Sequence, residues 1–200
     1  MLSGTFPSQL KYDIVKPLVK KGDKENVANY RPIFLLTSFS KIFEWNIYDR
    51  LLKHIETNNI LDVEQFGFRT SSSTEKDSYK LIDDTLNVLN NRLMVRGIFC
   101  DVQRAFDCVN HNILLTKLEF YGITGITYKL LKSYLRGKYQ RVVFNNYSSI
   151  SCSNWGEITH GVPQGWILSP LLFLLYINDL TQITNDNSKI VLFADDTRTL

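Results

Sequence analysis

Apolar residues recur at helical spacing in two long segments of the first half of the chain. The first segment runs from Ser40 to the pair Asn58 and Asn59, and the second follows Ser72 and Glu75, which have the spacing of a helix-capping box. A period near 3.6 residues predicts one amphipathic helix in each segment. The apolar positions are Ile42, Phe43, Ile47, Leu51, Leu52 and Ile55 in the first segment, and Tyr79, Ile82, Leu86, Leu89 and Leu93 in the second.

Shorter patterns follow in the second half of the chain. Residues 98–100 and 189–194 are apolar runs that predict buried strands, and residues 197–200 continue as a strand after the second run. The other predicted elements are helices over 111–121, 126–135 and 167–180, and strands over 139–145 and 150–158 that are joined by a polar turn. Helices outside a small sheet, in this mixed order, favour an α+β fold.

The composition excludes a disordered chain but does not indicate whether the protein binds nucleic acid. Of 200 residues, 44% are hydrophobic and 22% charged, with a net charge of +3. Residues 120–156 contain no acidic side chain, and tyrosines alternate with their basic ones. Such a stretch suits contact with a phosphate backbone, and a solvated surface explains it equally. The basic residues are Lys129, Lys132, Arg136, Lys138 and Arg141.

Cysteine usage indicates a reducing, intracellular compartment. The three cysteines form no C-x-x-C pair, so neither a disulfide framework nor structural zinc is expected, and each is predicted to be a buried apolar side chain. No signal peptide opens the chain. The most apolar run, residues 166–177, is too short to span a membrane and is predicted to be a buried helix.

Three aspartates stand where predicted strands end. Asp101 follows the first apolar run, and the pair Asp195 and Asp196 closes the last one. Adjacent carboxylates at the end of a buried strand repel one another, and a divalent cation such as Mg²⁺ relieves that repulsion. Two such ions serve phosphoryl transfer. A plain hairpin turn is the alternative interpretation of the Asp-Asp pair.

Several separated motifs, in order, resemble the reverse transcriptases of non-LTR (LINE-type, jockey-like) retrotransposons. The similar segments are residues 29–33 with 40–44, residues 65–69, residues 101–107 with 109–111, residues 160–165 with 170–180, and residues 193–196. Together they extend over residues 16–200, and this agreement identifies the chain as a member of that family.

The resemblance implies a right-hand polymerase with fingers, a partial palm made of an antiparallel sheet flanked by helices, and no thumb. Residues 1–95 would form the first fingers segment and 96–122 the first palm segment. Residues 123–158 would be a basic fingers insertion, and 159–200 the truncated remainder of the palm. The chain then looks like the front part of a longer, C-terminally truncated enzyme.

The resemblance also implies the catalytic residues. Asp101 and Asp195 would bind both of two Mg²⁺ ions, with Mn²⁺ as an alternative metal. Asp196 would support them, and the backbone carbonyl of Val102 would complete the nucleotide-side site. A primer 3′-OH would attack the α-phosphate of a dNTP and release pyrophosphate.

Further residues are assigned to nucleotide and template by the same resemblance. Arg31, with Lys20 or Lys21, would bind the triphosphate, because a planar guanidinium grips phosphate in a bidentate manner. Phe106 would be the steric gate that excludes a ribose 2′-OH, and the loop of Gln164 and Gly165 would lie under the templating pair. The expected partners are an RNA template and a DNA primer, held by Arg69, Lys138 and Arg141, with action in the nucleus.

Two alternatives stay open. One is a catalytically dead, nucleic-acid-binding remnant of a retrotransposon. The other is an RNA-directed RNA polymerase, which Phe106 and Ala194 disfavour. Trp166 and Ser169 depart from the family pattern, where serine and glycine are usual, and so do residues 70–72.

Overall fold

The computed structural model describes residues 3–20, 22–69, 72–102, 104–145, 150–183 and 190–199. The chain forms two compact units, one from Met1–Arg50 with Phe106–Ser169 and the other from Leu51–Ala105 with Pro170–Leu200. The helices are α1 (Ser38–Thr57), α2 (Thr74–Asn90), α3 (His111–Phe120), α4 (Gly125–Leu135) and α5 (Ser169–Ile177).

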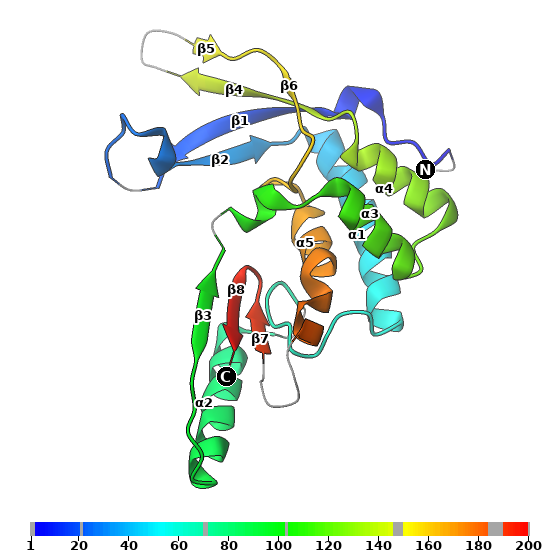
Figure 1. Cartoon of the computed structure of the whole chain (residues 1–200). Coiled ribbons are helices and arrows are strands. Elements are labelled where there is room, and N and C mark those ends of the chain that lie inside the picture. Colours follow the sequence, from blue (N-terminus) through cyan, green and yellow to red (C-terminus); the bar gives the residue numbers. More distant parts are fainter. Residues whose placement is uncertain are drawn as a thin grey trace. The chain divides into compact units, whose positions relative to one another are not determined.

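The first unit is built on a five-stranded mixed sheet (Figure 1). Strand β1 pairs antiparallel with β2 and parallel with β4, and β4 in turn pairs antiparallel with β5 and β6. One face of β1 is buried, because Asp13 and Val15 point into the unit while Tyr12 and Lys16 are exposed. The strands are β1 (Tyr12–Val19), β2 (Tyr30–Leu35), β4 (Tyr139–Asn145), β5 (Ile150–Cys152) and β6 (Gly156–Glu157).

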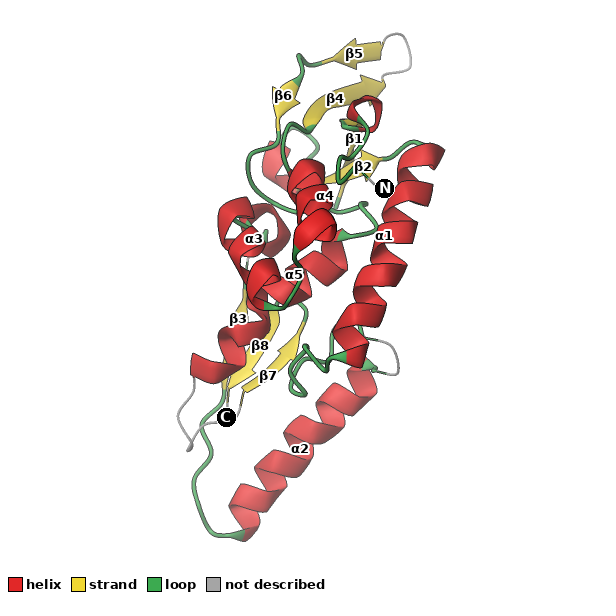
Figure 2. Cartoon of the chain, turned by 90° about the vertical axis from the view of Figure 1, so that its right-hand side faces the viewer, coloured by secondary structure: helices red, strands yellow, loops and turns green. Residues whose placement is uncertain are grey.

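Helices α3 and α4 form the apolar core of the first unit. They lie side by side (Figure 2). Their inward faces are almost entirely buried. Asn110 caps α3, since its side chain accepts hydrogen bonds from the backbone N–H groups of Asn112 and Ile113. The buried residues are Leu114, Leu115 and Leu118 of α3, and Leu130, Leu131, Tyr134 and Leu135 of α4.

The second unit contains a three-stranded antiparallel sheet in the order β3-β8-β7 (Figure 2). The strands are β3 (Ile98–Asp101), β7 (Ile190–Phe193) and β8 (Asp196–Thr199). The central residues of β7 are buried, as predicted, and the apolar run of α5 from Leu171 to Leu175 is buried throughout. Within the parts of the chain that the structure describes, every helix is too short or too polar to traverse a bilayer.

Several sequence-based expectations about burial are wrong. Strand β3 is exposed at all four positions, and the three cysteines are exposed free thiols rather than buried side chains. The N-cap of α2 is Ser73 rather than Ser72, because the Ser73 hydroxyl accepts the hydrogen bond from the Lys76 N–H. The predicted turn between β4 and β5 falls on residues 146–149, which lie outside the described ranges.

Candidate active site

Three aspartates lie at one end of the antiparallel sheet of the second unit. Asp101, the last residue of β3, pairs directly with Asp196, the first residue of β8. Asp195 stands beside Ala194 in the two-residue turn that joins β7 to β8. Directly opposed residues of an antiparallel pair share a face of the sheet. The side chains of Asp101 and Asp196 therefore lie on the same face, with Asp195 next to them.

The donor chemistry of this sheet end suits a hard divalent cation. Carboxylate and carbonyl oxygens are the ligands that Mg²⁺ takes, and Val102, with its own carbonyl, directly follows Asp101. Among the described residues, however, no three His, Cys, Asp or Glu side chains converge closely enough to enclose a metal ion. The strand register and the oxygen donors suit a divalent cation, but the described carboxylates are not close enough together to enclose one.

A segment that precedes α2 extends this sheet by one further pairing. The Phe66 N–H donates to the Leu192 carbonyl at 2.8 Å, and the Leu192 N–H donates to the Glu64 carbonyl at 2.9 Å. Residue 65 thus forms a parallel bridge with residue 192 of β7. The Lys80 ammonium of α2 lies 2.6 Å from a carboxylate oxygen of Glu64 and ties that helix to the same segment.

Gln65 holds the turn that carries Asp195. Its side chain is 1% exposed, and its Oε1 accepts hydrogen bonds from the N–H groups of Gly67 at 2.9 Å and Ala194 at 3.2 Å. Ala194 has a φ of +55°, a conformation that residues with a side chain rarely adopt. A Cβ on Gly67 would overlap the backbone nitrogen of Ala194, so only glycine lets the segment approach the turn this closely.

Residues 65–69 form one of the recognised sequence motifs, but the sequence alone indicates no role for Gln65. No periodicity could have marked it, because the residue that it holds in the turn lies 129 positions further along the chain. An amide side chain can accept two N–H groups at once. The local sequence offered one signal for this role, an amide residue two positions before a glycine, here Gln65 and Gly67.

The residues predicted to bind the nucleotide lie in the first unit, on and beside the β1–β2 hairpin. Lys20 follows β1, and its N–H donates to the Asn29 carbonyl at 2.8 Å. Arg31 lies on β2 opposite Leu18, and both basic side chains are exposed. Lys21 lies outside the described residues.

The loop of Gln164 and Gly165 lies against the same hairpin. The Phe34 N–H of β2 donates to the Gln164 carbonyl at 3.2 Å. Gly165 has a φ of +112°, and a Cβ there would come within 2.6 Å of the Phe34 carbonyl oxygen. The loop therefore passes close to the strand that carries Arg31, and both of its central residues are exposed.

Phe106 lies on a segment that is fixed to the approach of this loop. The Val162 N–H donates to the Phe106 carbonyl at 2.8 Å, and His111 Nε2 donates to the Gly161 carbonyl at 2.7 Å. Burial lowers the pKa of His111, and the bond to Gly161 acts in the opposite direction. Phe106 itself is 8% exposed, as part of the 3₁₀ turn Ala105–Cys108.

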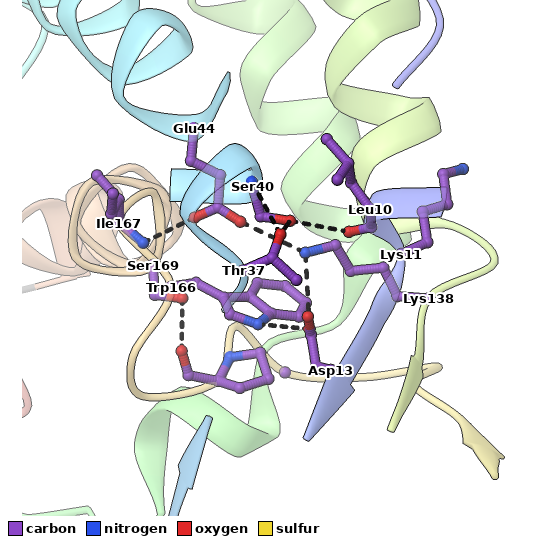
Figure 3. A network of polar contacts seen from close by, with 12 residues as sticks. Leu10, Lys11, Asp13, Thr37, Ser40, Glu44, Lys138, Trp166, Ile167 and Ser169 are labelled. Atoms are coloured by element: carbon purple, nitrogen blue, oxygen red, sulfur yellow. Dashed lines mark hydrogen bonds and ion pairs between the residues drawn. The ribbon is translucent and has the colours of Figure 1, made fainter. Parts of the chain in front are cut away.

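Lys138 does not lie where a nucleic acid could touch it, so its predicted role is wrong. The side chain is 0% exposed, and its ammonium lies 3.5 Å from Glu44 Oε1 and 3.8 Å from Asp13 Oδ2 (Figure 3). The basic pattern of residues 120–156 could not reveal this, because both partner carboxylates come from the first 50 residues. From the sequence alone, Lys138 was predicted to be an exposed positive charge.

The other two basic residues assigned to nucleic acid are half-buried. The Arg69 guanidinium donates to the carbonyls of Asp62 at 2.6 Å and Gln65 at 3.2 Å, which fixes the loop before α2. Arg141 of β4 lies over the Trp155 ring, 4.7 Å from its centroid. Arg141 therefore keeps a partly open face beside an aromatic ring, whereas Arg69 is engaged by backbone.

Comparisons with known proteins agree on one family. The model of the family described as reverse transcriptase (RNA-dependent DNA polymerase) matches residues 19–199. The probable RNA-directed DNA polymerase from transposon X-element of Drosophila melanogaster is 36% identical over 195 residues, covering 96% of this chain and 21% of the relative. The RNA-directed DNA polymerase from mobile element jockey of the same organism is 31% identical over 204 residues, with coverages of 98% and 22%.

The fold has a counterpart among solved structures. Apo telomerase from Candida tropicalis, truncated from its C-terminal domain, superposes with a TM-score of 0.67 at 13% identity, over 96% of this chain and 44% of that one. The chain spans about a fifth of the length of the curated relatives that it matches. On the family match and these identities, the chain belongs to the reverse transcriptase (RNA-dependent DNA polymerase) family, and its relatives are non-LTR retrotransposon polymerases, as the motifs predicted.

Proposed function

We propose that this chain supplies the catalytic sheet end and the nucleotide-binding hairpin of an RNA-directed DNA polymerase. The observation that carries the proposal is the register of Asp101 opposite Asp196, with Asp195 in the adjoining turn. In this proposal the three-stranded sheet belongs to the palm and the five-stranded sheet to the fingers. The substrates are dNTPs, a DNA primer and an RNA template, with the nucleus as the place of action.

The carboxylates of Asp101 and Asp195 would hold both of two divalent cations, Mg²⁺ or Mn²⁺, with Asp196 and the Val102 carbonyl beside them. When bound, two such ions activate the attacking oxygen and stabilise the leaving one in phosphoryl transfer. The primer 3′-OH loses its proton to water, its oxygen bonds to the α-phosphorus, the bond from that phosphorus to the oxygen bridging the α- and β-phosphates breaks, and pyrophosphate leaves. The chain's own part is to fix the carboxylates, which Gln65 does by holding Ala194 in the turn.

The first unit would bind the incoming nucleotide. Arg31 and Lys20 present exposed positive charge for the triphosphate, and a guanidinium can grip two phosphate oxygens at once. Lys21, outside the described residues, is proposed for the same role from the sequence alone. Gln164 and Gly165 support the templating pair through their backbone, because Gly165 admits a close neighbour.

Phe106 would exclude ribonucleotides by filling the space of the 2′-OH. A bulky ring held in a nearly buried position can select between sugars by shape, and the bond from the Val162 N–H fixes the backbone that carries this ring. A smaller side chain at position 106 would open that space.

Primer extension tests the function. The parent chain, Asp195→Asn and the exposed control Asp49→Asn are compared for Mg²⁺-dependent incorporation of dTTP on an RNA template with a DNA primer. Loss of a carboxylate that holds both ions should reduce incorporation by at least about a hundredfold, and the α1 control should behave as the parent. We expect short products only. Equal incorporation by Asp195→Asn and the parent would overturn the proposal.

A binding remnant without catalysis is the second candidate, and the surface around Arg141 favours it. Tyr12 and Tyr139 stack with ring centroids 5.4 Å apart, and Trp155 lies edge-on to Tyr12 at 5.1 Å. Aromatic rings beside a cation suit stacking of unpaired bases. If neither the parent nor Asp195→Ala extends a primer while both bind an RNA–DNA hybrid equally, this second candidate is correct.

A further inference from the structure

A buried lysine stands at the centre of the first unit and is not part of the proposed nucleotide contacts. Lys138 precedes β4, and its Nζ lies 3.4 Å from the centroid of the Trp166 ring and 4.0 Å from that of Tyr134. Burial lowers the pKa of Lys138, and the nearby carboxylates of Glu44 and Asp13 act in the opposite direction. Burying an ammonium away from water costs folding free energy unless ion pairs and other contacts offset that cost. The contacts of the buried Lys138 therefore indicate what this residue does.

The two carboxylates beside Lys138 each hold the chain directly after Gly165. Asp13 Oδ2 accepts a hydrogen bond from Trp166 Nε1 at 2.8 Å, and Glu44 Oε2 accepts one from the Ile167 N–H at 2.8 Å (Figure 3). All of these groups are buried or half-buried in the first unit. The lysine thus neutralises the two acceptors that anchor the exit of the loop.

The entry of the loop is anchored separately. The Ser169 hydroxyl donates to the Pro163 carbonyl at 2.8 Å, and the Phe34 N–H donates to the Gln164 carbonyl at 3.2 Å. The Trp166 N–H also donates to the Pro163 carbonyl at 3.3 Å, while the Gln164 side chain is exposed and the glycine after it has none. These bonds therefore hold the loop at its two ends and between them along the backbone.

We propose that Lys138 is a positioning residue for the loop formed by Pro163, Gln164 and Gly165. Acting through Asp13 and Glu44, its charge keeps Trp166 and Ile167 in place, and this in turn holds Gly165 in its left-handed conformation against β2. That the loop meets the templating pair rests on the proposed function, but the positioning itself does not. Without the ammonium, two carboxylates would be buried near each other with no cation between them.

Hydrogen exchange tests the positioning without requiring catalysis. In Lys138→Met, the Ile167 amide and the Trp166 indole N–H should exchange about tenfold faster or more, because the two buried carboxylates that accept these bonds would repel each other without the ammonium and move or take up a proton. Amides of β7 should exchange as in the parent. The matched control is Lys129→Met, which removes an exposed positive charge from α4 and should change neither rate.

A second variant separates positioning from folding. Lys138→Met combined with Glu44→Gln removes the charge pair but retains an acceptor for the Ile167 N–H, so it should fold even where the single variant does not. In this double variant the Trp166 indole N–H, whose acceptor Asp13 has lost its cation, should still exchange fast, while the Ile167 amide should return toward the parent rate. Parent-like exchange at both groups in Lys138→Met, or loss of protection throughout the chain in both variants, overturns the proposal.

Steady-state kinetics provide a further test, because a loss of folded stability alone would not change the KM for the nucleotide. If the parent incorporates dTTP, Lys138→Met should raise the KM for the nucleotide about tenfold with a smaller change in kcat, since the loop contributes to binding. Failure of the parent to polymerise would count against the proposed function only, because the exchange measurement stands by itself.

Discussion

At the scale of single residues, the candidate site depends on groups that contact no substrate. Gln65 and Gly67 meet the turn that carries Asp195 from a segment about 130 positions earlier in the chain, one through an amide oxygen and the other by lacking a side chain. Neither residue has the chemistry of a ligand. The reactive aspartates could be found from their place after apolar runs, whereas these supports could be found only in three dimensions.

Replacing Gly67 by alanine tests this support. The added Cβ would overlap the backbone of Ala194, so the segment or the turn must move, and overpacking of this kind typically costs about 1–3 kcal/mol. Urea unfolding should show that loss in free energy of unfolding, and Mn²⁺ affinity should fall with it. Gly156→Ala is the matched control, since a Cβ there meets nothing within 4 Å and should change stability little. Equal effects of the two substitutions would contradict the tight approach.

At the scale of elements, helical periodicity predicted α1, α3 and α4 within a few residues, because each buries one apolar face. The apolar run of residues 98–100 predicted a buried strand, yet β3 is exposed although its composition is that of a core strand. The basic pattern and the family resemblance misplaced Lys138, which a charge count cannot distinguish from a solvated lysine. Local patterns report what a segment could bury, and only the tertiary partners, here Asp13 and Glu44, decide what it does bury.

The contact between the start of α3 and the approach to the loop predicts a pH dependence. Because burial lowers the pKa of His111 below its ordinary 6.5, the unfolded chain takes up a proton near pH 6.5 while the folded chain resists it. The free energy of unfolding should therefore fall as pH decreases from about 7, until the folded histidine also titrates. His111→Gln keeps a donor for Gly161 and should reduce this slope.

Urea midpoints at several pH values between about 7.5 and 5, which bracket the usual pKa of histidine, measure that slope. His54→Gln in α1 is the control: this histidine is half-buried and belongs to the second unit, so its replacement should leave the slope as in the parent. A parent-like slope in His111→Gln would show that the buried histidine does not govern the acid response of this unit.

At the scale of the whole molecule, the near-neutral net charge hides an uneven surface. Within the described residues of the second unit, the apolar stripe that predicted α2 is exposed rather than buried. Strand β3 adds two more exposed apolar side chains, Ile98 and Phe99. The exposed stripe consists of Tyr79, Ile82, Leu86, Leu89 and Leu93. Contiguous apolar surface of this kind promotes association, and a net charge of +3 opposes it only weakly.

We therefore expect the 200-residue chain to associate with itself through α2 at about 10–100 µM, a range in which exposed apolar surface commonly drives association. Leu86→Lys combined with Leu89→Lys should return it to a monomer without loss of folded stability, because more than half of each side chain is exposed. Light scattering coupled to size exclusion measures the mass directly. Val63→Lys, which removes an isolated exposed side chain, should leave association unchanged. A parent that stays monomeric at the highest concentration would show that the stripe on α2 is compatible with solvent, and the prediction would then be wrong.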